Sequence, residues 1–168
     1  MNKSINKNLL LQCGAFLKHK KLKLCCAESM TAGFLSSTWA LEKHSGSYFL
    51  GAIICYDRII KTELLNVSDK LIDRYTPVSS EVTLAMLSGL KYLLSFSDVY
   101  ISVTGLAYAS NNSNQDRPIG TIYYAFSYRE HEKLFQKYIP KGTASEIIAQ
   151  ACNNIYEDLY HWLKQIID

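Results

Sequence analysis

Residues able to do chemistry stand at the ends of three apolar runs in this sequence. Ser29 follows the first run, Tyr56 closes the second with Lys61 five residues further on, and Thr104 closes the third. A serine hydroxyl becomes a nucleophile when a nearby base takes its proton, and a desolvated lysine with a lowered pKa is such a base. A tyrosine hydroxyl beside them can relay or donate a proton. Together the residues favour nucleophilic catalysis, with Ser29 as nucleophile, Lys61 as base and Tyr56 as proton relay. Taken singly, Tyr56 is as readily a strand-end aromatic residue and Lys61 a solvated helix lysine.

The segment around Ser29, residues 27–33 with the sequence AESMTAG, combines hydroxyls with small residues before an expected helix. Backbone N–H groups at a helix N-terminus bind anions, and small residues let backbone approach a ligand closely. A serine in this position is also a common helix cap, whose oxygen accepts a backbone N–H. Position alone leaves both interpretations of Ser29 open. In the functional one, amides at the start of the helix hold the oxyanion.

The apolar pattern predicts the elements that position these residues. Strands are expected at 22–27, 48–56, 99–104, 121–128 and 134–139, the last two forming a hairpin. Helices, about five in all, are expected at 5–20, 31–41, 59–65, from Ser79 onward and at 143–167. The continuous apolar run at 48–56 predicts a strand buried on both faces.

Helices that alternate with buried strands predict an α/β fold, a three-layer α/β/α sandwich with a mixed sheet of about five strands. The 168 residues are expected to form a single domain, 1–168. In open α/β sheets ligands bind outside the carboxyl ends of the strands, so the three polar strand ends are expected to converge on one site.

Composition narrows the classes of function. Hydrophobic residues make up 48% of the chain and charged residues 20%, which is typical of a globular protein. The net charge of +3, with no basic run longer than residues 18–21, predicts no nucleic-acid partner. No apolar stretch approaches the ~20 residues of a membrane span, and no signal-like apolar segment follows the N-terminus. We therefore expect a cytoplasmic protein with no membrane partner.

The cysteines are odd in number, and their spacing matches no metal-ligand pattern, so we predict no metal ion and no cofactor. They are Cys13, Cys25, Cys26, Cys55 and Cys152. Buried free thiols in a reducing compartment are the expected state. A nucleophilic Cys25 or Cys26, beside the Ser29 segment, is the alternative.

Six short motifs, in the same order and with similar spacing, resemble the C-terminal domain family of CinA. Residues 27–33 (AESMTAG) resemble AESxTGG, and residues 51–56 (GAIICY) followed by Lys61 resemble GGVVxY followed by Lys. The others are 65–67 (LNV), 78–82 with 85–86 (VSSEV, AM), 102–107 (SVTGLA) and 117–121 (RPIGT). Each motif is weak alone, and the resemblance rests on their order across nearly the whole chain.

The resemblance implies a nicotinamide-mononucleotide deamidase, which converts nicotinamide mononucleotide and water to nicotinate mononucleotide and ammonia in pyridine-nucleotide salvage. It implies the same α/β/α sandwich, a pyridine nucleotide as substrate, and a homodimer or larger homo-oligomer. Carried over by motif, Ser29, Tyr56 and Lys61 are the catalytic candidates. The substrate-binding candidates are Glu28, Thr31, Ala32, Gly33, Thr104, Gly105 and Arg117.

Two departures affect the parts that would hold a mononucleotide. After Ala107 the family continues GPxGG, whereas residues 108–112 here read YASNN, which places a phenol ring where bare backbone would approach a ligand. Two arginines near the C-terminus are replaced in the stretch 140–148, where Lys141 offers only a point charge. Arg58 or Arg117 are the candidate replacements. Two alternatives to the deamidase follow: a diverged module that binds a nucleotide or protein, and an amidase for a less anionic substrate.

Overall fold

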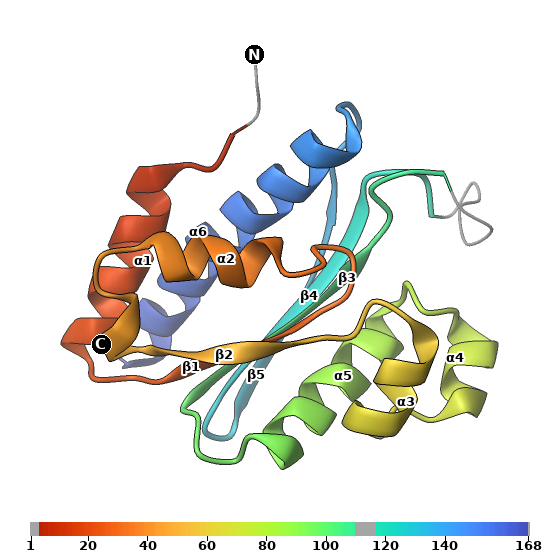
Figure 1. The fold of residues 1–168 in the computed structure, drawn as a ribbon, viewed down its shortest axis with the longest axis horizontal. Coiled ribbons are helices and arrows are strands. Elements are labelled where there is room, and N and C mark those ends of the chain that lie inside the picture. The colour runs from red at the N-terminus through yellow and green to blue at the C-terminus, as the bar shows by residue number, and fades with distance from the viewer. Residues whose placement is uncertain (1–3, 110–116, 168) are drawn as a thin grey trace.

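The computed structural model describes residues 4–109 and 117–167. Its strands form one mixed sheet in the order β2-β1-β3-β4-β5 (Figure 1). β1 is parallel to both of its neighbours, whereas β4 is antiparallel to β3 and β5. The bounds are β1 (Leu24–Glu28), β2 (Phe49–Ile54), β3 (Val99–Gly105), β4 (Thr121–Tyr128) and β5 (His131–Tyr138). The predicted mixed sheet of about five strands is confirmed.

Helices cover both faces of this sheet (Figure 1). On one face lie α1 (Lys7–His19), α2 (Phe34–Leu41) and α6 (Ala144–Ile167). On the other lie α3 (Arg58–Leu65), α4 (Asp69–Tyr75) and α5 (Ser80–Leu93). Each layer of helices buries its own apolar core against the sheet, so the predicted three-layer sandwich is confirmed. Among the described residues, no helix is long and apolar enough to span a membrane.

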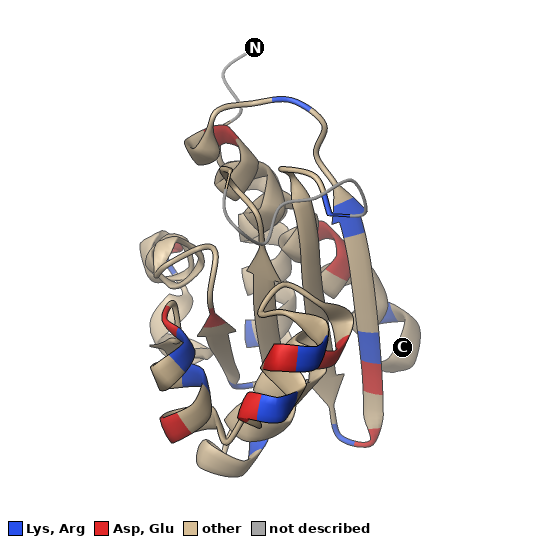
Figure 2. Ribbon diagram, turned by 90° about the vertical axis from the view of Figure 1, so that its right-hand side faces the viewer, with Lys and Arg blue, Asp and Glu red and all other residues tan. Residues whose placement is uncertain are grey.

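β2 corrects the expectation of a strand buried on both faces at 48–56. It is an edge strand, and the side chains of Leu50 and Ile54 are 42% and 41% exposed. The apolar run looks like that of a central strand, but β1, β3 and β4 occupy the centre of the sheet and are buried almost throughout. The other edge strand, β5, carries charged side chains along its length, which β2 lacks (Figure 2).

Further differences from the pattern concern one short helix, α4, and the starts of β1 and β5. α4 was not expected, because its seven residues are too few to show a helical period. β1 begins at Leu24 rather than residue 22, since the N–H of Leu22 donates to the carbonyl of Leu17 at the end of α1. β5 begins at His131 rather than residue 134, because Arg129, at a φ of 54°, makes the hairpin turn tight.

Gly89 lets α5 lie directly against the end of α3. A Cβ on Gly89 would stand 1.9 Å from the carbonyl oxygen of Leu65, which is backbone and cannot swing aside. We expect Gly89→Ala to lower the free energy of unfolding by about 2–3 kcal/mol, measured by urea denaturation, because the helices must separate. Gly46→Ala is the control, since its Cβ would meet nothing within 4 Å. Equal midpoints for the two variants would contradict this packing.

Candidate active site

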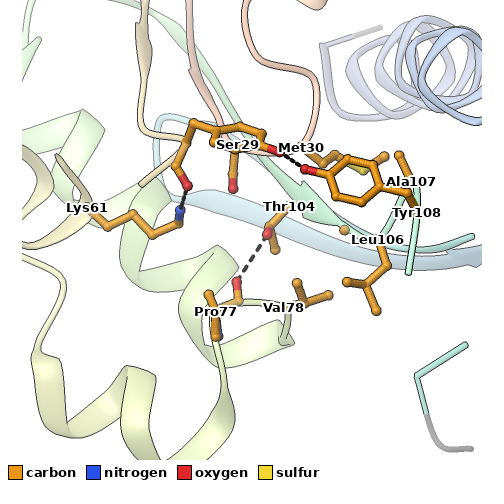
Figure 3. A pocket seen from close by; sticks show the side chains of 11 residues that line it. Ser29, Met30, Lys61, Pro77, Val78, Thr104, Leu106, Ala107 and Tyr108 are labelled. Atoms are coloured by element: carbon orange, nitrogen blue, oxygen red, sulfur yellow. Dashed lines mark hydrogen bonds between the residues drawn. The ribbon is translucent and has the colours of Figure 1, made fainter. Parts of the chain in front are cut away.

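Ser29, Tyr56, Lys61 and Thr104 line one cavity of about 210 Å³, together with Gly105. The cavity lies at the carboxyl ends of β1, β2 and β3, the edge where ligands bind in open α/β sheets. The three polar strand ends therefore converge as expected. Its remaining lining residues are Met30, Pro77, Val78, Leu106, Ala107 and Tyr108 (Figure 3).

Ser29 is the first residue after β1, and its N–H donates to the carbonyl of Val103 in β3 at 3.0 Å. α2 begins only at Phe34, with Gly33 as its N-cap residue, so Ser29 does not cap this helix. The Ser29 side chain points into the cavity between Lys61 and Thr104 (Figure 3). Within the described residues its hydroxyl makes no hydrogen bond, which leaves it available to a ligand.

Glu28, rather than Ser29, caps the start of α2. The Glu28 side chain is fully buried, and its Oε2 accepts hydrogen bonds from the Thr31 hydroxyl (2.7 Å), the Gly33 N–H (3.0 Å) and the Leu35 N–H (3.1 Å). Its Oε1 accepts from the Ser36 N–H at 2.8 Å. The carboxylate thus neutralises the positive end of the helix and occupies its free amides.

This capping changes which amides can meet an oxyanion. The N–H groups of Gly33, Leu35 and Ser36 already donate to Glu28. Those of Met30 and Thr31, directly after Ser29, donate to no acceptor in the part of the chain that the structure describes. They are the amides closest in the chain to the Ser29 hydroxyl.

The four substrate-binding candidates of the Ser29 segment do not line the cavity. Glu28 and Thr31 are buried and hydrogen-bonded to each other. Ala32 and Gly33 both have a positive φ, 47° and 95°, which turns the chain from β1 into α2. The structure therefore places these residues behind the cavity, where they shape the turn that carries Ser29.

Lys61 reaches back from α3 to the end of β2. Its side chain is 1% exposed, and Nζ donates to the carbonyl oxygens of Cys55 at 2.6 Å and Tyr56 at 3.0 Å. Burial lowers the pKa of Lys61, because the charged amine is desolvated. Two donated hydrogen bonds use both hydrogens of a neutral amine, so its lone pair stays free to accept a proton. Lys61 is thus equipped to act as a base.

Tyr56 and Tyr108 line the mouth of the cavity, and their hydroxyls form a hydrogen bond. Figure 3 shows Tyr108 beside Ala107. The two side chains are 50% and 52% exposed, so they form the boundary between cavity and solvent. Tyr108 belongs to the departure noted at 108–112, of which residues 110–112 lie outside the described residues.

Thr104 and Gly105 join β3 to the opposite wall. The Thr104 hydroxyl donates to the carbonyl of Pro77 at 3.0 Å, which ties the segment before α5 to the sheet. A Cβ on Gly105 would stand 2.4 Å from the Met30 sulfur and 2.7 Å from the Thr121 carbonyl oxygen. The absence of a side chain at Gly105 therefore lets the end of β3 lie close to Met30 in the turn after Ser29.

Neither candidate replacement arginine lines the cavity. Arg58 lies on the surface, where its guanidinium pairs with Asp69 and Asp73 at 2.6 Å each. Arg117 lines a separate hollow of about 330 Å³, and its Nη1 donates to the Thr76 hydroxyl at 2.8 Å and the Tyr75 carbonyl at 3.1 Å. Arg117 thus holds the segment that continues into the cavity wall at Pro77.

Six lining residues were not site candidates, although Met30, Val78, Leu106 and Ala107 lie within the quoted motifs. Leu106, Ala107 and Tyr108 directly follow Thr104 and Gly105, so their place next to a polar strand end was a usable signal. Pro77 and Val78 come from the segment before α5, which reaches the cavity only through tertiary packing. In the sequence, only the motif at 78–82, which begins at Val78, marks this segment.

The cysteine alternative is not supported by the environment of the two thiols. All five cysteines are buried and free, as expected. Burial raises the pKa of Cys25 to about 11 and that of Cys26 well above its ordinary value, so neither is a ready thiolate at neutral pH. Neither side chain lines the cavity. Among the described residues, no group of His, Cys, Asp or Glu is arranged to hold a metal ion.

The fold and the cavity define a class of protein: an α/β/α sandwich with a serine, a tyrosine and a buried lysine at the carboxyl ends of its parallel strands. A sequence model of the family described as the CinA C-terminal domain matches residues 6–163. The chain belongs to this family.

Relatives by sequence include long and short proteins. A CinA-like protein of Pseudothermotoga lettingae is 34% identical over 122 residues, which cover 71% of this chain and 30% of that protein. The chain spans about a third of the length of such CinA-like relatives. A protein of Enterobacter agglomerans named nicotinamide-nucleotide amidohydrolase PncC is 29% identical over 143 residues, covering 85% of this chain and 86% of that protein.

Solved structures share the fold. A competence damage-inducible protein A (ComA) of Klebsiella pneumoniae superposes with a TM-score of 0.85 at 22% identity, covering 94% of this chain and 96% of that one. A CinA superfamily protein of Escherichia coli gives 0.83 at 24% identity, with coverage of 92% and 88%. At these identities the likeness concerns the fold alone.

Proposed function

We propose that this protein is an amidohydrolase that releases ammonia from the carboxamide of a pyridine nucleotide, with nicotinamide mononucleotide as the reference substrate. One observation carries the proposal: a serine hydroxyl with no hydrogen bond among the described residues shares one cavity with a buried lysine whose pKa is lowered by desolvation. The name of the Enterobacter agglomerans relative supports the substrate class.

In the proposed reaction, Ser29 Oγ attacks the carboxamide carbon while Lys61 Nζ accepts the hydroxyl proton. The amides of Met30 and Thr31 stabilise the oxyanion of the tetrahedral intermediate. The carbon–nitrogen bond breaks, and the leaving nitrogen takes the proton from Lys61 with Tyr56 as relay, so that ammonia departs. Water then attacks the ester on Ser29 and gives a proton to Lys61 Nζ. Lys61 returns this proton to Ser29 Oγ as the carbon–oxygen bond breaks, which restores the hydroxyl and releases the acid as its carboxylate.

The test is ammonia release from nicotinamide mononucleotide by the purified protein. For each nicotinamide mononucleotide consumed, we expect one ammonia and one nicotinate mononucleotide. The Ser29→Ala protein serves as the blank. Ammonia no higher than this blank would contradict the proposed activity on this substrate. Stabilisation by the nucleotide in a thermal-shift assay, without turnover, would favour the alternative of a diverged binding module.

Several sequence-based expectations stay predictions. They are a single domain over 1–168, assembly as a homodimer or larger homo-oligomer, a cytoplasmic location, and no nucleic-acid partner. The edge strand β2 carries no charged side chain and exposes Leu50 and Ile54, which suits pairing with a second copy of the chain.

A further inference from the structure

Tyr108 closes one side of the cavity that holds Ser29. Its ring lines the cavity (Figure 3), and its hydroxyl forms a hydrogen bond with that of Tyr56 across the mouth. Two phenol rings joined in this way form an aromatic rim above the serine. A substrate group that extends from the cavity into solvent on this side passes the rim.

The space beneath the rim suits a small flat group. The cavity measures about 210 Å³, below the ~300–1,000 Å³ of pockets that hold drug-sized ligands. Its walls are apolar at Met30, Val78 and Leu106, and polar at Ser29 and Lys61. One aromatic ring bearing a carboxamide fits this division, with the amide toward Ser29 and the ring against the apolar wall and the tyrosine rim.

The charges of the cavity do not suit a phosphate. Lys61 is the one cationic side chain among the described residues that line it, and Lys61 Nζ already donates to the carbonyls of Cys55 and Tyr56. Phosphate binding relies on charge-assisted hydrogen bonds, best from a guanidinium. Arg58 and Arg117 lie elsewhere, the first paired with two aspartates and the second in the separate hollow.

We propose that Tyr108 is a specificity-determining residue that restricts the cavity to the aromatic carboxamide end of a substrate, so that carboxamides without a phosphate are preferred to nicotinamide mononucleotide. The proposal rests on the proposed function for the orientation of the carboxamide. It concerns binding, however, and is testable without turnover.

The experiment measures the Kd of nicotinamide and of nicotinamide mononucleotide by calorimetry, in the Ser29→Ala protein with and without Tyr108→Ala. We expect nicotinamide to bind more tightly while Tyr108 is present. Removal of the Tyr108 ring should change the ratio of the two Kd values by about tenfold in favour of nicotinamide mononucleotide. The wider mouth admits the mononucleotide, and nicotinamide loses an aromatic contact with Tyr108. Tyr108→Phe should keep most of the preference, since it keeps the ring.

Tyr92→Ala is the matched control, because Tyr92 is an exposed tyrosine on α5 outside the cavity. It should leave the ratio of the two Kd values unchanged. A ratio that Tyr108→Ala does not move, tighter binding of the mononucleotide with Tyr108 in place, or binding of neither compound would each overturn the proposal. Failure of the proposed function gives another result. The expected binding preference would persist, but the protein with Ser29 intact would release no ammonia from either compound.

Discussion

Replacing Lys61 by Met is expected to lower kcat/KM for amide hydrolysis by about a thousandfold or more. It should lower the free energy of unfolding by only about 1–3 kcal/mol, because the carbonyls of Cys55 and Tyr56 lose a donor. Methionine keeps the apolar stem of the side chain in its buried place and removes only the amine that would accept the Ser29 proton. Ammonia release at several substrate concentrations measures the kinetic effect, and urea denaturation measures the stability. Adding Ser29→Ala to Lys61→Met should cost little more, because both residues serve one proton transfer.

Lys70→Met is the matched control, since Lys70 is an exposed lysine on the neighbouring helix α4. It should retain the activity of the parent protein. A Lys61→Met protein that hydrolyses the substrate within tenfold of the parent rate would remove Lys61 from the mechanism.

The titration of Lys61 gives this prediction a second readout. Burial lowers the pKa of Lys61 in the folded protein below its ordinary value of 10.5. The rate should therefore rise with pH through a midpoint below 10.5, as the amine becomes neutral. Between the folded and unfolded pKa values the unfolded chain binds more protons, so the free energy of unfolding also rises with pH across that window. Lys61→Met should abolish this rise in stability.

The layers of the fold were predictable because they follow from local patterns. Helical spacing and buried strands alternate along the chain, and short connections allow few arrangements other than a sandwich. The place of each strand within the sheet was not predictable in the same way. The apolar sequence of β2, which includes Leu50 and Ile54, is typical of a central strand, yet β2 pairs with β1 alone. Strand order depends on tertiary packing, which an apolar run does not record.

The positions of the site residues in the chain were predictable from the sequence, whereas the directions of their side chains were not. Ser29, Tyr56 and Thr104 were recognisable because polar residues at strand ends share one edge of a sheet. The direction of each side chain was not. Arg117 lines a separate hollow beside the cavity. Arg58 forms ion pairs with Asp69 and Asp73 on α4, a helix too short to be expected from the sequence. Contacts made by long side chains depend on which elements meet in space.

Glu28 illustrates how a residue can support a site without lining it. Its carboxylate is fully buried and accepts one hydroxyl and three backbone hydrogen bonds at the start of α2. Its own backbone carbonyl accepts the N–H of Cys55 at 2.8 Å, next to the strand end that carries Tyr56. Glu28 therefore joins the turn of Ser29, the start of α2 and the end of β2.

Glu28→Ala is expected to lower the free energy of unfolding by about 3–5 kcal/mol, because it leaves buried amides and a hydroxyl without their acceptor. In a domain of this size that corresponds to a fall in Tm of roughly 10 °C, measurable by calorimetry. Glu28→Gln should lie between, since one amide oxygen still accepts while its NH2 group faces other donors. Glu63→Ala, an exposed glutamate on α3, is the control and should change stability by less than about 0.5 kcal/mol. If Glu28→Ala were as mild as this control, the carboxylate would not hold α2, and the Ser29 turn would need another source of rigidity.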